Sequence, residues 1–317
     1  MKSFQVNLSG GLGNQMFQYA FAKALSLRWK INFNLDVSSF NQSRQSDKVR
    51  PLEIFLFPNI QEQTLESSLL VKYLQGKKFP YRQLHNLMVH FPLDVVLWAY
   101  HVYFQKRYSM EMNLSRLTAA EQMRHIPTMF IGSWQNESFF HDFSHEIRQA
   151  FEFPKKRLSS QTVILSEEIA GISNSVSIHV RRGDYLSSQF KEFYSGVCSE
   201  KYYSRARICI EKQIVEPCYI VFSDDMTWCR QNLKLPEGTI FVDWNKGRDS
   251  WQDMYLISQC HHHIVANSSF SWWGAWLGTK NQDSVTIAPD HWYADDKWEQ
   301  LDGKFVVPSH WLKIKTP

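Results

Sequence analysis

The sequence predicts an α/β protein with parallel strands and helices on both faces of a sheet. In the second half, short apolar segments typical of strands alternate with segments of helical periodicity, and such alternation is typical of parallel sheets. Near the N-terminus, one strand, a glycine-rich turn and one helix follow each other. The length of 317 residues is sufficient for two domains of ordinary size.

The first element is a predicted strand over residues 4–8, followed by a glycine-rich turn. A helix is predicted over 14–29, because apolar residues recur there near a 3.6-residue period. Such a turn presents backbone N–H groups at the positive end of a helix, which suits an anion. It matches neither the dinucleotide fingerprint, since Met16 takes the place of the third glycine, nor a P-loop, since no Gly-Lys-Ser/Thr follows.

The middle of the chain is less regular. Residues 60–125 look helical and irregular, a strand is predicted over 129–132, and a helix over 141–151. Pro154 and three basic residues follow that helix, and we place the domain boundary there. The prediction is an N-terminal domain over 1–157 and a C-terminal domain over 158–317, whose last residues are candidates for packing back on the first domain.

The second half contains the alternation that indicates the parallel sheet. Predicted strands lie at 175–179, 219–222, 239–242, 263–266 and 285–288. Predicted helices lie at 199–214, 250–260 and 270–278.

Composition narrows the function classes. A net charge of +4 and a pI near 8.7 are too mild to indicate a nucleic-acid binder. Five cysteines without a CxxC pair argue against a zinc ribbon and a disulfide framework, and favour a reducing compartment. The N-terminus has no long apolar segment of a signal peptide, and no apolar stretch reaches about 18 residues. We therefore expect a cytoplasmic protein.

One stretch is more basic than the rest. Between residues 71 and 107, Asp94 is the only acidic residue among six Lys and Arg residues. Two interpretations stay open: peripheral association with an anionic membrane surface, or a solvated basic face on helices of an acceptor-binding domain.

Polar residues follow the predicted strands. Arg181 and Arg182 follow the strand at 175–179 after one residue, Val180, at the end where open α/β sheets bind ligands. A guanidinium is a permanently charged fork that matches phosphate oxygens two at a time. A solvated surface turn is the alternative.

Candidate catalytic or ligand-binding residues also lie at three other ends of predicted strands or helices. Asp224 and Asp225 could act in acid/base catalysis, or could cap the next helix and fix the arginine pair. Asp253, near the start of a helix, could accept hydrogen bonds from a guanine edge or interact with the helix dipole. Asparagine and serine residues between a strand and a helix could cap that helix or help to bind an anion; these are Asn267, Ser268 and Ser269.

Taken together, four segments resemble the motifs shared by bacterial α-1,2-fucosyltransferases. The resemblance spans residues 10 to about 290, and the motifs occur in the expected order. The segments are Gly10-Gly11-Leu12-Gly13-Asn14-Gln15-Met16-Phe17-Gln18-Tyr19, His179-Val180-Arg181-Arg182-Gly183-Asp184-Tyr185, Phe222-Ser223-Asp224-Asp225 and Asn267-Ser268-Ser269-Phe270-Ser271-Trp272-Trp273.

The resemblance implies a GT-B-like enzyme, with two Rossmann-like domains facing a cleft and GDP-fucose held by the C-terminal domain. It implies that Arg181 contacts the β-phosphate and that His179 and Asp253 read guanine. Ser269 corresponds to a pyrophosphate contact, and Asn14 to the asparagine that reaches the donor from the N-terminal domain. The other predicted donor-binding residues are Gly13, Arg182, Asp224, Asp225, Asn267 and Ser268.

The resemblance also implies an inverting, metal-independent mechanism without a cofactor, GDP-fucose being a co-substrate. A fixed arginine and helix-end N–H groups stabilise charge that develops on the β-phosphate. The sequence has no Asp-x-Asp motif, and the three consecutive histidines at 261–263 sit at a predicted helix-to-strand join, so no metal site is expected. Asp184 and Glu137 are the candidates for a general base, although Asp184 could instead orient the arginines.

The expected reaction is transfer of fucose to the 2-hydroxyl of a terminal β-galactoside with inversion, forming an α-1,2 linkage. The galactoside could belong to an O-antigen repeat, a host-like glycan or free lactose. The alternatives are a transferase that uses another GDP-sugar, such as GDP-mannose, and a catalytically inactive glycan-binding protein.

Overall fold

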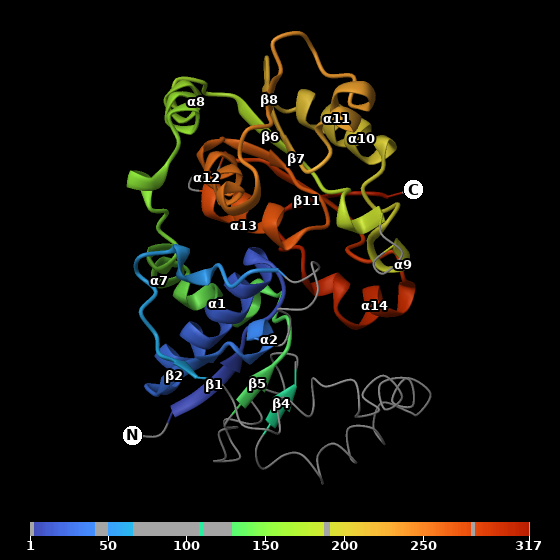
Figure 1. Cartoon of the computed structure of the whole chain (residues 1–317). Coiled ribbons are helices and arrows are strands. Elements are labelled where there is room, and N and C mark those ends of the chain that lie inside the picture. The colour runs from blue at the N-terminus through green and yellow to red at the C-terminus, as the bar shows by residue number, and fades with distance from the viewer. Residues whose placement is uncertain are drawn as a thin grey trace. The chain divides into compact units, whose positions relative to one another are not determined.

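The computed structural model describes residues 3–41, 50–65, 108–110, 129–186, 191–279 and 283–316. The chain divides into two compact units, Met1–Glu152 and Phe153–Pro317. The division therefore falls after residue 152, whereas the sequence placed the boundary after residue 157. Each unit contains a parallel sheet, as expected for the α/β class (Figure 1). The basic stretch at 72–107 lies outside the described residues.

The sheet of the first unit has the strand order β3-β2-β1-β5-β4, and its described strands are all parallel. Its strands are β1 (Ser3–Asn7), β2 (Asn32–Asp36), β3 (Thr64–Leu65), β4 (Tyr108–Met110) and β5 (Met129–Ile131). The predicted first strand and the strand near 129 are confirmed. β2 was missed, although its alternation of polar and apolar residues is the usual pattern of a strand.

Helix α1 (Leu12–Trp29) follows β1 through the glycine turn, in which Gly10 has a φ of +75°. It is buried on most sides, because aromatic residues surround it; Phe21 stacks on Trp134 with the ring centres 3.8 Å apart. The chain leaves the helix at Lys30, which adopts the left-handed conformation with a φ of 54°. This helix carries the chain from the end of β1 to the start of β2.

Short helices make up the rest of the described part of the first unit. The helix predicted over 141–151 begins as a 3₁₀ turn and is α-helical only from Ser144. Besides α1, the described α-helices are α2 (Ser38–Asn41) and α7 (Ser144–Ala150), and the described 3₁₀ helices are η1 (Ile54–Leu56), η2 (Glu137–Phe139) and η3 (His141–Phe143).

The sheet of the second unit has six described strands, all parallel, in the order β11-β10-β9-β6-β7-β8. Numbered from β6 as the first, this is the 3-2-1-4-5-6 order of a doubly wound sheet. The strands are β6 (Ser175–Val180), β7 (Cys218–Ser223), β8 (Ile240–Val242), β9 (His262–Ile264), β10 (Thr286–Pro289) and β11 (Leu312–Ile314). All five predicted strands are present, and β11 was not predicted.

Helices cover both faces of this sheet (Figure 1). On one face, apolar residues of β6 and β7 form a core with α10 (Glu200–Glu211) and α11 (Met226–Asn232). On the other face, α13 (Ser269–Gly278) meets β6 and β9, since His179 contacts Phe270 and the ring of His263 abuts Gly278. The remaining helices are α8 (Ser160–Ala170), α9 (Lys191–Tyr194), α12 (Trp251–Gln259), α14 (Asp296–Leu301), η4 (Lys155–Arg157), η5 (Asp184–Leu186), η6 (Gly247–Asp249) and η7 (Gly303–Phe305).

The end of the chain belongs to the second unit. β11 pairs with β10, and Trp311, just before it, packs against Trp272 with the ring centres 5.5 Å apart. The last strand thus completes the second sheet rather than returning to the first domain, because its ladder bonds and its aromatic contact are both made there.

Candidate functional site

The strand order of the second sheet selects one edge as a candidate site. β6 has β7 on one side and β9 on the other, so the strand order reverses between β6 and β9. Doubly wound sheets bind ligands at the carboxyl ends of the strands at such a point. Arg181 directly follows β6, Ser268 lies between β9 and α13, and Ser269 is the first residue of α13. Two motifs far apart in the sequence therefore meet at this edge.

Arg181 is held by two carboxylates. Its Nε and Nη2 atoms lie 2.9 Å and 2.7 Å from Oδ1 of Asp184, and its Nη1 lies 3.0 Å from Oδ2 of Asp224. Burial by itself lowers the pKa of Arg181, but the charges of Asp224 and Asp184 raise it above its usual value. These contacts engage three of the five N–H groups of a guanidinium. Within the described residues, two N–H groups remain to meet an anion.

Arg182 and Gly183 lie against Asp224 and Asp225, which follow the neighbouring strand β7. The backbone N–H of Arg182 donates to Asp224 (2.9 Å), its Nε donates to Asp225 (3.1 Å), and its guanidinium lies 4.2 Å from the centre of the Trp228 ring. A Cβ at Gly183 would lie 2.8 Å from Oδ2 of Asp224, so a side chain there would displace that carboxylate.

Asp224 and Asp225 thus fix the arginine pair. Asp225 also caps α11 by accepting a hydrogen bond from the backbone N–H of Trp228 (3.1 Å). Helix capping and fixing of the arginine pair are the two alternatives to acid/base catalysis that the sequence left open.

His179 is buried at the end of β6, where its ring contacts Phe270 of α13 at 5.5 Å. Burial, assisted by the nearby charge of Arg181, lowers its pKa to about 4, so the imidazole is neutral at physiological pH. Its Nδ1 has no hydrogen-bond partner within the described part of the chain. A neutral imidazole nitrogen could donate to or accept from a ligand.

The segment between β9 and α13 is tied down by Asn267. Its amide nitrogen donates to the backbone carbonyls of Tyr194 (3.3 Å) and Trp292 (3.0 Å). Contact between the donor and this side chain stays a prediction. Ser268 occupies the N-cap position and Ser269 is the first residue of α13, so both lie at the positive end of a ten-residue helix.

Asp253 lies in the first turn of α12 within a separate hydrogen-bond chain. Asn245 donates to its Oδ1 (2.9 Å), and Thr162 of α8 donates to Asn245 (3.2 Å). Burial raises the pKa of Asp253 to about 7, although the bond from Asn245 opposes that shift. Sequence reasoning found Asp253 and missed Asn245, whose position just beyond β8 was the available signal.

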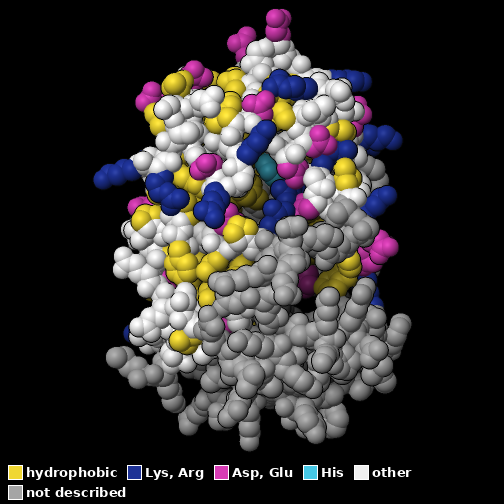
Figure 2. Space-filling view, viewed as in Figure 1, with side chains coloured by type: hydrophobic (Ala, Val, Ile, Leu, Met, Phe, Trp, Pro, Cys, Tyr) yellow, Lys and Arg dark blue, Asp and Glu magenta, His cyan; other side chains and the backbone are white. Residues whose placement is uncertain are grey.

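Exposed cations precede both α8 and α12 in the chain. Lys155, Lys156 and Arg157 precede α8, and Arg157 lies over the ring of Trp251 at 5.9 Å. Lys246 and Arg248 precede α12 and are also exposed. Figure 2 shows Lys and Arg side chains, with Asp and Glu side chains among them, on the visible face.

The first unit has a comparable edge, because β1 lies between β2 and β5. Asn14, in the first turn of α1, accepts a hydrogen bond from the side chain of Gln135, which follows β5 (2.9 Å). Gly10 packs against Asn14, since a Cβ there would lie 2.6 Å from its Nδ2. Gly13 is buried within α1. Gln135 was not predicted, although it too follows the end of a strand.

Glu137 also belongs to the first unit, at the start of η2. Its carboxylate lies 3.8 Å from Nδ1 of His141. Burial lowers the pKa of Arg148, and the charge of Glu137 opposes that shift. Glu137 therefore faces two basic side chains of its own unit.

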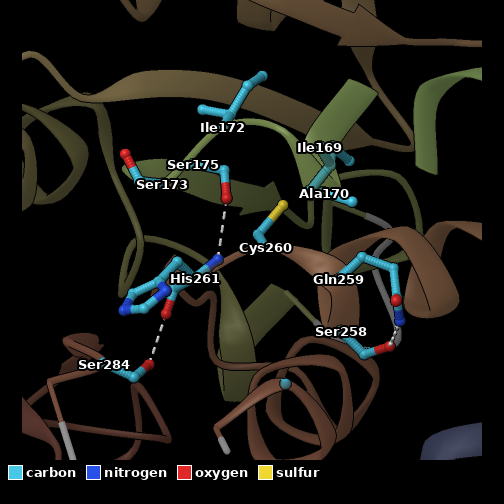
Figure 3. A pocket seen from close by; sticks show the side chains of 11 residues that line it. Ile169, Ala170, Ile172, Ser173, Ser175, Ser258, Gln259, Cys260, His261 and Ser284 are labelled. Atoms are coloured by element: carbon cyan, nitrogen blue, oxygen red, sulfur yellow. Dashed lines mark hydrogen bonds between the residues drawn. The ribbon is translucent and has the colours of Figure 1, made fainter. Parts of the chain in front are cut away.

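A cavity of about 220 Å³ lies at the amino ends of the strands of the second sheet, opposite the end that carries Arg181 (Figure 3). Its walls include Ser175, Cys260, His261 and Ser284. The backbone N–H of His261 donates to Ser175, and the hydroxyl of Ser284 donates to the carbonyl of His261. No predicted site residue lines it, and parallel sheets bind ligands at the other ends of their strands. We therefore place the candidate site at the arginine edge.

The described residues contain no cluster of three or more His, Cys, Asp or Glu side chains arranged to hold a metal ion. None of their helices combines the length and apolar character needed to cross a membrane.

The family of the chain follows from comparison with known proteins. Residues 3–314 match the model of glycosyl transferase family 11. The chain belongs to glycosyl transferase family 11. This family 11 chain is 31% identical over 315 residues to an α-1,2-colitosyltransferase from Escherichia coli, a match that covers 97% of each protein.

Other relatives of this family 11 chain carry related names. The O-antigen biosynthesis glycosyltransferase WbnK of Escherichia coli is 31% identical, over 93% of this chain and 96% of WbnK. Galactoside α-(1,2)-fucosyltransferase 1 of Saimiri boliviensis boliviensis is 30% identical, over 49% of this chain and 43% of its own length. Among solved structures, the fucosyltransferase NodZ from Bradyrhizobium is 16% identical over 86% of this chain and 92% of NodZ, with a TM-score of 0.46.

Proposed function

We propose that this family 11 glycosyltransferase transfers fucose from GDP-β-L-fucose to the 2-hydroxyl of a terminal β-galactoside, with inversion, to form an α-1,2 linkage. The observation that carries the proposal is the position of Arg181 at the end of β6, beside the N-terminus of α13. A guanidinium and a helix N-terminus that lie together where the strand order reverses can both bind a diphosphate.

The proposed chemistry follows from where negative charge develops. Cleavage of the bond between fucose and phosphate leaves charge on the β-phosphate, which Arg181 and the α13 N-terminus would stabilise. The sugar carbon becomes oxocarbenium-like, and the acceptor hydroxyl attacks from the face opposite the departing GDP. Inversion at that carbon converts the β-linked donor into an α-linked product.

The two candidates for the general base differ in their surroundings. Asp184 is bound by both Nε and Nη2 of Arg181, which favours a role in orienting the arginine. Glu137 lies in the first unit, which in the proposed GT-B arrangement would supply the acceptor side of a cleft. We therefore propose Glu137 as the candidate to accept the proton of the acceptor hydroxyl, with Asn14 reaching the donor from the same unit.

The names of the relatives support an α-1,2 linkage and indicate GDP-colitose as a second candidate donor. An α-1,2-colitosyltransferase and galactoside α-(1,2)-fucosyltransferases share the α-1,2 linkage in their names. Colitose is fucose without the hydroxyl at carbon 3, so the same phosphate contacts would serve GDP-colitose. The relative WbnK is named for O-antigen biosynthesis, which supports an O-antigen repeat as the galactoside acceptor. Association with an anionic membrane stays a prediction.

One experiment tests the proposal. The purified chain is incubated with GDP-fucose, GDP-colitose or GDP-mannose and a panel of β-galactosides, and the linkage in each product is determined by NMR. We expect fucosylation at the 2-hydroxyl without an added cofactor. Faster transfer from GDP-colitose would reassign the donor. Binding of galactosides without transfer from any GDP-sugar would favour an inactive glycan-binding protein.

A further inference from the structure

We propose that Tyr185 is a positioning residue that fixes the spacing between Arg181 and the N-terminus of α13. The inference rests on the proposed function, because it concerns the two groups that would bind the donor pyrophosphate. Tyr185 itself is assigned no contact with the donor. It acts through the groups that it holds.

The hydroxyl of Tyr185 links the loop after β6 to the loop after β9, at the point where the strand order reverses. It donates to the backbone carbonyl of Asn267 (2.8 Å) and also interacts with the side chain of Ser268. Burial raises the pKa of Tyr185 above its usual value, so the hydroxyl keeps the proton that it donates. Its partners come directly before α13, so this hydrogen bond anchors the start of that helix to the loop after β6.

The aromatic ring of Tyr185 also contacts Arg181. The Arg181 guanidinium lies 5.8 Å from the ring centre. Tyr194 stacks on the same ring, with ring centres 4.6 Å apart and planes 17° apart. Tyr194 in turn contacts Tyr293 at 5.6 Å. The ring is therefore fixed in an aromatic cluster that extends across three segments of the second unit.

The sheet alone does not fix this spacing. The paired residues of β6 and β9 end at Ile178 and Ile264, before Arg181 on one strand and before Ser268 on the other. Beyond that point the Tyr185 hydroxyl links the two loops directly, whereas Asn267 ties its own segment to Tyr194 and Trp292. A diphosphate bridging both groups requires them at one separation, and small misplacements near a reacting bond can cost up to about a hundredfold in rate.

The test uses two variants that each remove one tyrosine hydroxyl. Tyr185→Phe removes the bond to Asn267 and keeps the ring. The matched control is Tyr202→Phe, because the Tyr202 hydroxyl donates to the carbonyl of Val265 (2.6 Å), in the same segment between β9 and α13. Turnover with GDP-fucose, the Michaelis constant, the melting temperature, and the dissociation constants for GDP and guanosine are measured for both variants and the parent.

We expect Tyr185→Phe to lower kcat between about tenfold and a hundredfold, and to weaken GDP binding while leaving guanosine binding unchanged. The control should keep both kcat and GDP affinity, even if its melting temperature falls as much. A purely structural role for Tyr185 would weaken GDP and guanosine binding equally, in line with the loss of stability.

The outcomes separate this inference from the proposed function. Full kcat and GDP affinity in Tyr185→Phe, or an equal loss in the control, would overturn the inference and leave the proposed function intact. A parent protein that transfers no fucose, with a variant that selectively loses GDP affinity, would overturn the proposed function alone. A parent that binds no GDP would overturn both.

Discussion

At the scale of single residues, Arg181 shows how a cation can be prepared for an anion. Two aspartates hold the guanidinium in place, so little side-chain freedom is left to lose when a phosphate binds. A preorganised donor of this kind stabilises developing charge without reorganisation during the reaction. The sequence identified both the arginine and its surrounding carboxylates, but not which carboxylate binds which nitrogen.

We expect Arg181→Ala to lower kcat by about a hundredfold to a thousandfold, the usual cost of one lost charge-stabilising group. Arg181→Lys should recover little, because an ammonium cannot reproduce the bidentate fork. The matched control is Arg230→Ala, which removes a half-exposed ion pair with Asp243. Steady-state kinetics and melting temperatures are compared. A retained turnover in Arg181→Ala would refute the assignment.

Asp253 should make donor binding depend on pH. Its pKa is about 7 because burial disfavours the carboxylate, and only the carboxylate accepts both N–H groups of a guanine edge. The Michaelis constant for GDP-fucose should therefore fall as pH rises through about 7. Asp253→Asn should raise that constant more than it lowers kcat, remove this pH dependence and relax the preference for guanine over other bases.

Two results would contradict that role. Equal losses of affinity for GDP and for a nucleotide with another base would indicate a structural function of Asp253. An unchanged pH profile in Asp253→Asn would show that another group titrates.

At the scale of elements, the close contact of α12 with α13 sets the position of the helix whose N-terminus enters the site. Gly274 of α13 permits this contact, because a Cβ there would lie 2.6 Å from Cγ2 and 2.9 Å from Cβ of Ile257 in α12. Both atoms belong to a stiff β-branched side chain, so neither helix can adjust by a simple rotamer change.

We expect Gly274→Ala to lower the free energy of unfolding by about 1–3 kcal/mol, the usual cost of overpacking a core. Gly171→Ala is the control. Its added Cβ would have the carbonyl of Glu168 as nearest atom at 3.4 Å, and its φ of −84° suits alanine. Urea denaturation measures both. Equal effects in the two variants would show that the helices can move apart.

At the scale of the whole molecule, the two units share one principle. Within the described residues, the first strand of each sheet in chain order lies between two other strands. The strand order therefore reverses beside it in both sheets. The candidates Asn14 and Glu137 come after β1 and β5 of the first sheet, and Arg181 and Ser269 come after β6 and β9 of the second. Both units therefore carry candidate residues beyond the carboxyl ends of strands that meet where the strand order reverses.

Metal-independent activity is expected for the molecule as a whole. Arg181, Arg182 and the α13 N-terminus supply positive charge where a diphosphate would lie, and the sequence has no Asp-x-Asp motif. Transfer measured with excess EDTA should equal transfer without it, and added Mg²⁺ or Mn²⁺ should not accelerate it. Loss of activity in EDTA that returns with either ion would show that a metal takes part.

The sequence by itself determined the order of five strands and three helices in the second half and the polar residues that follow the strands. These features are local, because hydrophobic periodicity and strand ends are written in neighbouring residues. The motif set also led to the family, which the match over residues 3–314 confirmed. Short elements such as β11 and α11 were missed, since a few residues carry too weak a period.

Only the tertiary structure decided which of these residues meet. The order of the second sheet places β6 beside β9, and that pairing brings Arg181 near Ser268 across more than 80 residues of chain. The assignments of Asp224 to the arginines, of Asn245 to Asp253 and of Tyr185 to Asn267 depend on the same long-range packing. No local pattern specifies such contacts, because they depend on how distant segments pack together.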